Sequence, residues 1–149
     1  MSPTLHAAGA PATAETYAEL QALYARQAWQ LDGAEADAFV ATFTEDAAFA
    51  HVSSGEVLEG RAAIAAALGR TATARRGAVY RHWFSQLRVE TTVDPDTVRA
   101  WYYAIVSVTD ATGAVTWDPS CVVEDVLVRR DGEWLTSHRI VRRDDLLLR

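Results

Sequence analysis

Lysine is absent from the sequence: all 14 basic residues are arginine, against 20 aspartates and glutamates, which gives a formal net charge of −6. An acidic chain with dispersed arginines lacks the basic surface that binds nucleic acid or an anionic membrane. The only cysteine, Cys121, excludes an internal disulfide and a site built from several thiolates. These features agree with a reducing compartment, so we expect a cytoplasmic protein with no nucleic-acid or membrane partner.

Long apolar runs and leader-like segments are also missing. No run approaches the roughly 18 residues that a membrane-spanning helix needs, and residues 1–14 lack the basic and apolar regions of a signal peptide. Their Pro, Gly, Ala and Thr content indicates a flexible N-terminal tail. Half of the 149 residues are hydrophobic, which is enough for one buried core. We therefore expect a single domain over residues 15–149.

Helical spacing characterises the first half of the domain. The first helix is expected to end at Asp32, with an apolar face made of Tyr17, Leu20, Tyr24, Ala28 and Leu31 at intervals of three and four. Shorter helices are expected over residues 36–43 and 62–68. A turn at 44–46, a strand over 47–53 with a short partner at 56–58, and an exposed loop over 70–77 complete this half.

The second half changes to a period of two. Strands are expected over residues 79–91, 97–110, 115–129 and 133–141, separated by short segments with hairpin-turn chemistry. Helices followed by a meander of long strands predict an α+β fold, in which a cone-shaped, curved antiparallel or mixed sheet packs with three N-terminal helices. The wide end of such a cone is a natural pocket for a small molecule.

His82 and Asp32 are the first candidates for chemistry. His82 alternates with aromatic residues in its strand, and both strand faces are partly apolar, so periodicity leaves open which face lines a pocket. A histidine of this kind is compatible with a structural role or with a general base near neutral pH. Asp32 has an ordinary explanation as the first residue of an Asp-Gly turn. However, a carboxylate at a helix C-terminus opposes the helix dipole, an unfavourable placement that is tolerable if Asp32 has another role. Asp32 is the partner that we choose for His82 in a hypothetical acid/base dyad.

The other histidines are weaker candidates. His51 shares a strand face with Phe49 and is a second pocket candidate, or else a strand-end residue in solvent. His138 shares a strand face with apolar residues, where packing explains it equally well. The histidines belong to no short ligand motif, so we expect no metal site. No glycine-rich phosphate loop occurs, and we expect no nucleotide or other cofactor.

Aromatic side chains are dense around these polar candidates. Most are expected in the core, while a few form a wall against a flat apolar ligand and a tyrosine donates a hydroxyl group. The substrate-binding candidates among them are Tyr24, Trp29, Phe49, Tyr103 and Trp117.

Four stretches resemble the SnoaL-like branch of the nuclear transport factor-like superfamily. Residues 24–43 are similar to the family's first helix, aspartate and second helix, and residues 43–47 to its helix-to-strand turn. Residues 58–64 resemble the start of its third helix, and residues 130–139 its final hairpin. The resemblance extends over residues 17–145. The branch includes scytalone dehydratase, dehydrochlorinase, polyketide cyclases and the small subunits of ring-hydroxylating dioxygenases.

The resemblance implies a cone-shaped α+β barrel and a set of site residues. In dehydratase-like members an aspartate at the end of the first helix pairs with a histidine on the first long strand, and these functions fall on Asp32 and His82. A pocket arginine of some members falls on Arg139. A pocket tyrosine of scytalone dehydratase falls near His51, and its second histidine has no match at residues 101–104, so scytalone is not the expected substrate.

Two kinds of function follow. The first is a cofactor-independent lyase, isomerase or cyclase that acts on a small apolar oxygenated substrate, of polyketide, aromatic or terpenoid type, through the Asp32–His82 pair. The alternative is a non-catalytic small subunit of a ring-hydroxylating oxygenase, or a ligand-binding module. In either case the exposed face of the curved sheet favours a homodimer or homotrimer.

Overall fold

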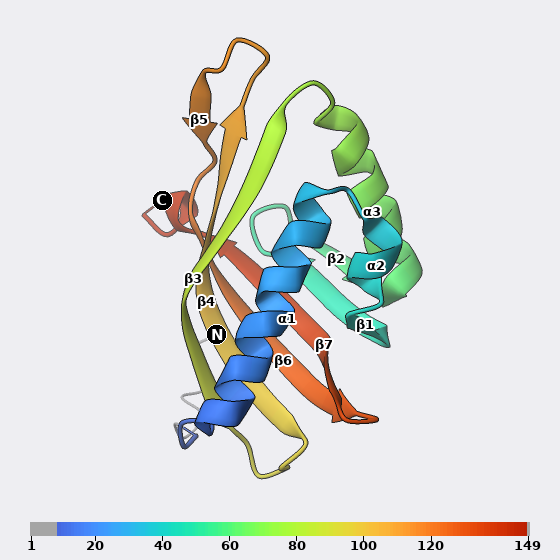
Figure 1. Ribbon diagram of the computed structural model, residues 1–149, viewed down its shortest axis with the longest axis vertical. Coiled ribbons are helices and arrows are strands. Elements are labelled where there is room, and N and C mark those ends of the chain that lie inside the picture. Colours follow the sequence, from blue (N-terminus) through green and yellow to red (C-terminus); the bar gives the residue numbers. More distant parts are fainter. Residues whose placement is uncertain (1–8, 149) are drawn as a thin grey trace.

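A computed structural model describes residues 9–148 (Figure 1). In this range the chain forms three α-helices and one mixed sheet of seven strands. The helices are α1 (Ala14–Asp32), α2 (Ala36–Val40) and α3 (Gly60–Ala74), and a short 3-10 helix, η1 (Asp144–Leu146), follows the last strand. The strands are β1 (Phe43–His51), β2 (Glu56–Glu59), β3 (Val79–Thr91), β4 (Thr97–Thr109), β5 (Val115–Trp117), β6 (Cys121–Arg130) and β7 (Glu133–Arg143).

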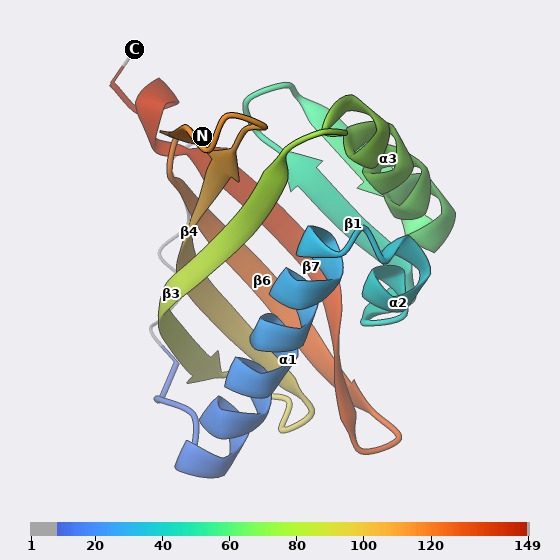
Figure 2. The ribbon, with the colours of Figure 1, turned by 45° about the horizontal axis from the view of Figure 1, so that its top comes forward.

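The sheet has the strand order β2-β1-β7-β6-β4-β3, and β5 pairs with the outer end of β4. The β1–β7 pair is parallel and the other pairs are antiparallel. The long strands curve around α1, while α2 and α3 lie beside β1 and β2 on the same side of the sheet (Figures 1 and 2). The α+β class and the helix-lined curved sheet expected from the sequence are therefore confirmed.

Helix α1 is defined by local chemistry at its start and by packing along its length. The Thr13 hydroxyl accepts a hydrogen bond from the backbone N–H of Thr16 and so caps the helix N-terminus. Its buried face contains Leu20, Leu23, Tyr24 and Gln27, which pack toward the long strands. A fully buried glutamine on this face is not expected from the sequence, and its partners belong to the site described below.

The interior is divided into two apolar clusters. One joins α1 to β3, β4, β6 and β7 around Leu20, Tyr102 and Leu127. The other joins α2, α3 and β1 around Phe39 and Phe43. Each cluster contributes residues to the wall of one cavity: Tyr102 and Phe84 come from the first cluster and its neighbours, and Phe39 and Phe49 from the second. The cavity between the two clusters offers space for a ligand.

Several element boundaries differ from those expected. Helix α2 ends at Val40, and the expected turn at 44–46 is part of β1, which pairs irregularly with β7 between Phe43 and Ala48. Such a bulge destroys the alternation by which a strand is recognised. Helix α3 continues through Gly69 to Ala74, so most of the expected loop over 70–77 is helical.

Strand β3 contains a bulge that changes which side chains face inward. The pairing with β4 shifts between Ser85 and Arg88, and Gln86 has a positive φ of 56°. As a result Leu87 and Val89 pack into the core, whereas Trp83 stays on the outer face. Strict alternation places these three residues on one face, which is wrong because the bulge inserts an extra residue.

The strand expected over residues 115–129 is two strands. The break falls at residues 118–120, where Pro119 has no N–H to donate to a ladder. Strand β5 therefore pairs with one end of β4, and β6 pairs with the remainder. The break turns Asp118 toward the cavity lined by both cores.

The expected tail over residues 1–14 is described only in part, because residues 1–8 lie outside the described residues. From Gly9 the chain runs along β3: the backbone N–H of Ala12 donates to Val89, and Ala10 accepts from Thr91. These bonds hold residues 9–13 against the edge of the sheet. Within residues 9–148 no helix has the length and apolar character to cross a membrane.

Candidate active site

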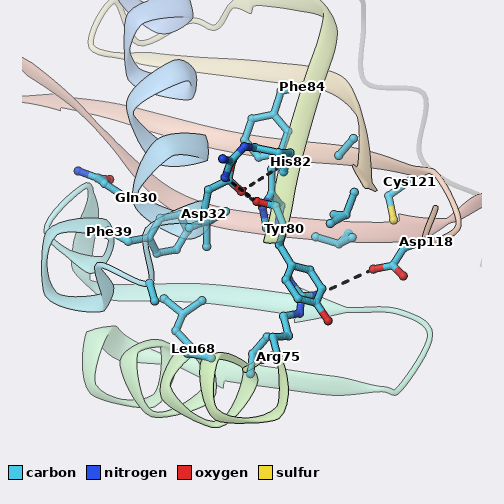
Figure 3. Close-up of a pocket in the computed structure, with 18 of the residues that line it drawn as sticks. Gln30, Asp32, Phe39, Leu68, Arg75, Tyr80, His82, Phe84, Asp118 and Cys121 are labelled. Atoms are coloured by element: carbon cyan, nitrogen blue, oxygen red, sulfur yellow. Dashed lines mark hydrogen bonds and ion pairs between the residues drawn. The ribbon is translucent and has the colours of Figure 1, made fainter. Parts of the chain in front are cut away.

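The last residue of α1 and the inner face of β3 meet at one hydrogen-bonded pair (Figure 3). Asp32 Oδ1 lies 2.7 Å from His82 Nδ1, and it also accepts the backbone N–H of His82 at 3.0 Å. Both side chains are mostly buried, with 12% of Asp32 and 15% of His82 exposed. Because a carboxylate only accepts, Nδ1 carries the proton of the neutral imidazole. The lone pair is therefore on Nε2, the nitrogen that a general base uses.

The pKa of His82 is lowered from its ordinary value. Burial lowers it, and this outweighs the hydrogen bond and the negative charge of Asp32, which raise it. Arg75 lowers the pKa further and Asp118 opposes that effect. The imidazole is consequently neutral at pH 7 and able to accept a proton. Asp32 would then stabilise the positive charge that forms on the ring.

A cavity of about 750 Å³ lies between the two cores and includes both dyad residues in its wall. Most of its wall is apolar. The apolar lining includes Leu31, Phe39, Phe49, Leu68, Phe84, Val106, Val123 and Val141. Polar and charged side chains from several different elements interrupt this apolar lining, an arrangement suited to orienting a small, mostly apolar molecule.

A buried ion pair lies at the wall of this cavity. Arg139 donates from Nε to Asp125 Oδ1 at 2.9 Å and from Nη2 to Asp125 Oδ2 at 2.8 Å. Nη2 also donates to Gln27 Oε1 at 2.7 Å, and the Tyr24 hydroxyl donates to Asp125 Oδ2 at 2.9 Å. All four side chains are at least 97% buried. The network joins α1 to β6 and β7 directly beneath the site.

The charge of Arg139 is balanced within the protein. Burial lowers the pKa of Arg139, but Asp125, followed by the neighbouring tyrosines, raises it above its ordinary value, so the guanidinium stays charged. The guanidinium carbon lies 5.1 Å from the Phe43 ring centre and 5.6 Å from that of Phe49. Arg139 is therefore a wall residue whose charge is largely committed to Asp125.

His51 provides a second imidazole on the cavity wall. It lies at the end of β1, and its ring stacks on Phe49 with centroids 4.9 Å apart. Burial lowers the pKa of His51, Glu56 raises it, and Arg139 lowers it. His51 is thus neutral at pH 7 and suited to donate or accept one hydrogen bond with a ligand.

The cavity also contains a charged pair beside β3. Arg75, at the end of α3, lies 3.9 Å from Asp118 and 4.3 Å from the ring centre of Tyr80 (Figure 3). All three residues line the cavity. None of them was singled out from the sequence, although Tyr80 shares the alternation of His82.

The structure brings together only some of the expected site residues. Asp32, His82, His51, Phe49 and Arg139 all line the cavity. Four aromatic candidates lie elsewhere. Tyr24 is buried in the network with Asp125, Trp29 is 80% exposed on α1, and Tyr103 and Trp117 are 56% and 55% exposed on the outer face of the sheet.

These aromatic candidates lie outside the cavity because their side chains point away from it. Trp29 projects from the solvent side of its helix, and strand alternation turns Tyr102 inward and Tyr103 outward. Two network members were missed: Gln27, which continues the buried helical spacing, and Asp125, a carboxylate within an apolar strand. Both patterns were visible in the sequence as polar residues at core positions.

The histidines do not form a common site. His138 is exposed and bonds Ser137, away from the cavity that contains His51 and His82. Among residues 9–148 no group of three or more His, Cys, Asp or Glu side chains has the arrangement of a metal site. Cys121 lines the cavity, but burial raises the pKa of its thiol, which disfavours the thiolate.

Comparison with known proteins gives a consistent family. A family model described as a SnoaL-like domain matches residues 12–140. The structure of Aln2 from a Streptomyces species is 41% identical, with a TM-score of 0.87, over 93% of this chain and 97% of that chain. ActVI-ORFA from Streptomyces coelicolor is 37% identical, with a TM-score of 0.81, over 88% and 98%.

A structure from Catenulispora acidiphila in complex with S-DNPA is also similar. It is 36% identical, with a TM-score of 0.82, over 91% of this chain and 98% of that chain. No curated protein sequence matches the chain significantly.

Proposed function

Because the chain belongs to the SnoaL-like domain family, we propose that it is an enzyme that uses Asp32 and His82 for general acid/base catalysis on a small apolar oxygenated molecule. The observation that carries this proposal is the 2.7 Å contact between Asp32 and His82 in the wall of a mostly apolar cavity. A neutral histidine held by a carboxylate is the arrangement that a general base needs near neutral pH.

The common chemical step is removal of a proton from carbon next to a carbonyl group. His82 Nε2 accepts the proton, Asp32 stabilises the imidazolium, and the electron pair moves toward the carbonyl oxygen. Return of the proton to another atom gives isomerisation, loss of a neighbouring hydroxyl as water gives elimination, and attack on a second carbonyl gives ring closure. Each route uses the side chains of this chain and draws on no metal, nucleotide or other cofactor.

The substrate class follows from the cavity. About 750 Å³ of mostly apolar space suits a molecule of two or three fused rings, such as a polyketide, aromatic or terpenoid-like compound. Phe49 offers a flat apolar surface, while His51 and Arg139 offer hydrogen bonds to oxygen atoms. The relative from Catenulispora acidiphila, crystallised with S-DNPA, supports a small-molecule ligand in this fold.

The test measures proton removal directly. In D2O, 1-tetralone exchanges the hydrogens next to its carbonyl group, and proton NMR follows the loss of their signal. We expect wild-type protein to accelerate this exchange and His82→Ala to reduce it to the buffer rate. Tyr17→Phe, on the exposed start of α1, is the matched control and should retain the wild-type rate. Wild-type exchange no faster than that of folded His82→Ala would refute the proposal.

A further inference from the structure

Four arginines line the cavity, and the guanidinium group of Arg75 makes no hydrogen bond among residues 9–148. Arg75 follows the last residue of α3. Its ion-pair partner is Asp118, but the 3.9 Å between Nη2 and Oδ2 is longer than a hydrogen bond. The two side chains are 30% and 48% exposed, and a loose pair of this kind contributes little to stability. The N–H groups of Arg75 are therefore available to a ligand.

Two other arginines of the wall have carboxylate partners at hydrogen-bond distance. Arg139 donates from Nε and Nη2 to both oxygens of the buried Asp125, and from Nη2 to Gln27. Arg143 donates from Nε and Nη2 to the two carboxylate oxygens of Asp145, at 3.0 and 2.8 Å. Each of these charges is thus balanced by a bidentate pair within the protein.

Arg81 lies on the opposite face of β3 from the base. It alternates with Tyr80 and His82 along the strand, its side chain is exposed, and Nη1 donates to the backbone carbonyl of Tyr80. Arg75 comes from α3, on the side of the sheet that the cavity occupies. Of the four arginines, Arg75 is therefore the cation best placed to meet a charged group of a bound molecule.

The Tyr80 ring holds the Arg75 guanidinium at the cavity wall. The guanidinium carbon lies over the ring, 4.3 Å from its centre, in a cation–π contact. Figure 3 shows the Arg75 side chain extending from α3 to this ring, with Asp118 beyond it and His82 further along β3. Arg75 is close enough to His82 for its charge to lower the pKa of the imidazole. The available cation and the base thus belong to one cavity.

A carboxylate is the group that fits Arg75 best. The planar guanidinium carries five N–H donors, and pairs of them match the two oxygens of a carboxylate. A phosphate has more charge and more acceptor oxygens than a single arginine satisfies. The remaining wall of the 750 Å³ cavity is mostly apolar and suits a carbon skeleton. Together these features describe an organic acid with an apolar ring system.

We propose that the substrate carries a carboxylate group that Arg75 binds, while its apolar rings occupy the cavity beside His82. This inference rests on the proposed function, because it names the substrate class of the same cavity. Arg75 is then a residue that determines specificity, and it selects acids over neutral molecules of the same shape. Asp118 competes with the ligand carboxylate, since both approach the same guanidinium group.

The experiment is isothermal titration calorimetry at pH 7 with 2-naphthoate and with 2-naphthamide, a neutral molecule of nearly the same shape. We expect wild-type protein to prefer 2-naphthoate. Arg75→Met should weaken 2-naphthoate binding roughly 10- to 10²-fold, the equivalent of a hydrogen bond to a charged group, and leave 2-naphthamide binding nearly unchanged. Asp118→Asn should strengthen 2-naphthoate binding, because it removes the competing carboxylate.

Two arginine variants serve as controls. Arg70 lies on the same helix and forms a similar loose pair with Glu56 at 3.8 Å, but its side chain is 66% exposed and lies outside the cavity lining. Arg70→Met and Arg143→Met should both retain the wild-type preference for 2-naphthoate. The NMR signals of the His82 ring should shift when 2-naphthoate binds to wild type, which places the ligand in the cavity.

Each failure has a distinct signature. If folded Arg75→Met binds 2-naphthoate as tightly as wild type, or loses both ligands equally, the inference is overturned. If Arg143→Met removes the preference and Arg75→Met does not, the carboxylate binds elsewhere and the role of Arg75 is wrong. If the preference is as expected but wild type exchanges 1-tetralone no faster than His82→Ala, the proposed function fails and the substrate assignment fails with it.

Discussion

Replacing Asp32 by asparagine should weaken the base without removing its hydrogen bond. Asparagine keeps an oxygen that can accept from His82 Nδ1, but it carries no negative charge. Asp32 raises the pKa of His82 through its hydrogen bond and its charge, so the replacement should lower that pKa still further. A hydrogen bond to a charged group contributes about 1.5–3 kcal/mol, and one between neutral groups about 0.5–1.5 kcal/mol. The difference, about 1–1.5 kcal/mol for the imidazolium, corresponds to a decrease in kcat of roughly 5- to 10-fold.

The assay is the pH dependence of 1-tetralone exchange, combined with an NMR titration of the His82 ring. Because the base works in its neutral form, activity falls as pH decreases through the pKa of His82. The acid limb should therefore move to lower pH in Asp32→Asn while the plateau rate decreases. A limb that moves to higher pH, or a plateau equal to that of wild type, would contradict the assigned role of Asp32. Circular dichroism of both proteins establishes that the fold is retained.

Three further outcomes follow from the structure. Burial lowers the pKa of His51 below 6.5, so its contribution to stability is present above pH 6.5 and lost as pH falls, and His51→Phe should lessen acid destabilisation in thermal melts. Arg139→Met leaves Asp125 buried without its partner and should cost about 3–5 kcal/mol in urea unfolding, whereas Arg70→Gln, from an exposed pair, should cost less than about 1 kcal/mol. Trp83 is 54% exposed on the outer face of the sheet, so Trp83→Glu should shift the expected homodimer or homotrimer toward monomer in light scattering, and an unchanged mass would exclude this face.

The fold was predictable because its signals are either periodic or carried by short motifs. The three-and-four spacing before Asp32 identified α1, and the change to alternation after residue 79 identified the long strands. The motif order identified the family, which the match over residues 12–140 confirms. The prediction that Asp32 pairs with His82 depended on the same resemblance, because no local sequence pattern relates residues 50 positions apart.

The predicted strand faces and strand boundaries are wrong where a single residue interrupts the inward–outward alternation of side chains. Gln86, with positive φ, reverses the inward face of β3, so Trp83 and Val89 lie on opposite sides of the sheet although alternation places them together. Pro119 divides an expected strand and brings Asp118 to the cavity. Bulges and breaks of this kind depend on the partner strand, and the sequence of one strand does not contain that information.

The buried network shows why Tyr24 and Arg139 resemble substrate contacts in the sequence. Each has its main partner in Asp125, 101 positions from Tyr24 and 14 from Arg139, and an isolated tyrosine or arginine gives no sign of such a partner. The network nevertheless acts on the site. A slide of α1 along its axis would disturb both the 2.9 Å Tyr24–Asp125 bond and the 2.7 Å Arg139–Gln27 bond, because Tyr24 and Gln27 move with the helix. Asp32 lies on the same helix, five residues after Gln27. The buried ion pair therefore anchors, through two hydrogen bonds, the same helix whose last carboxylate contacts His82.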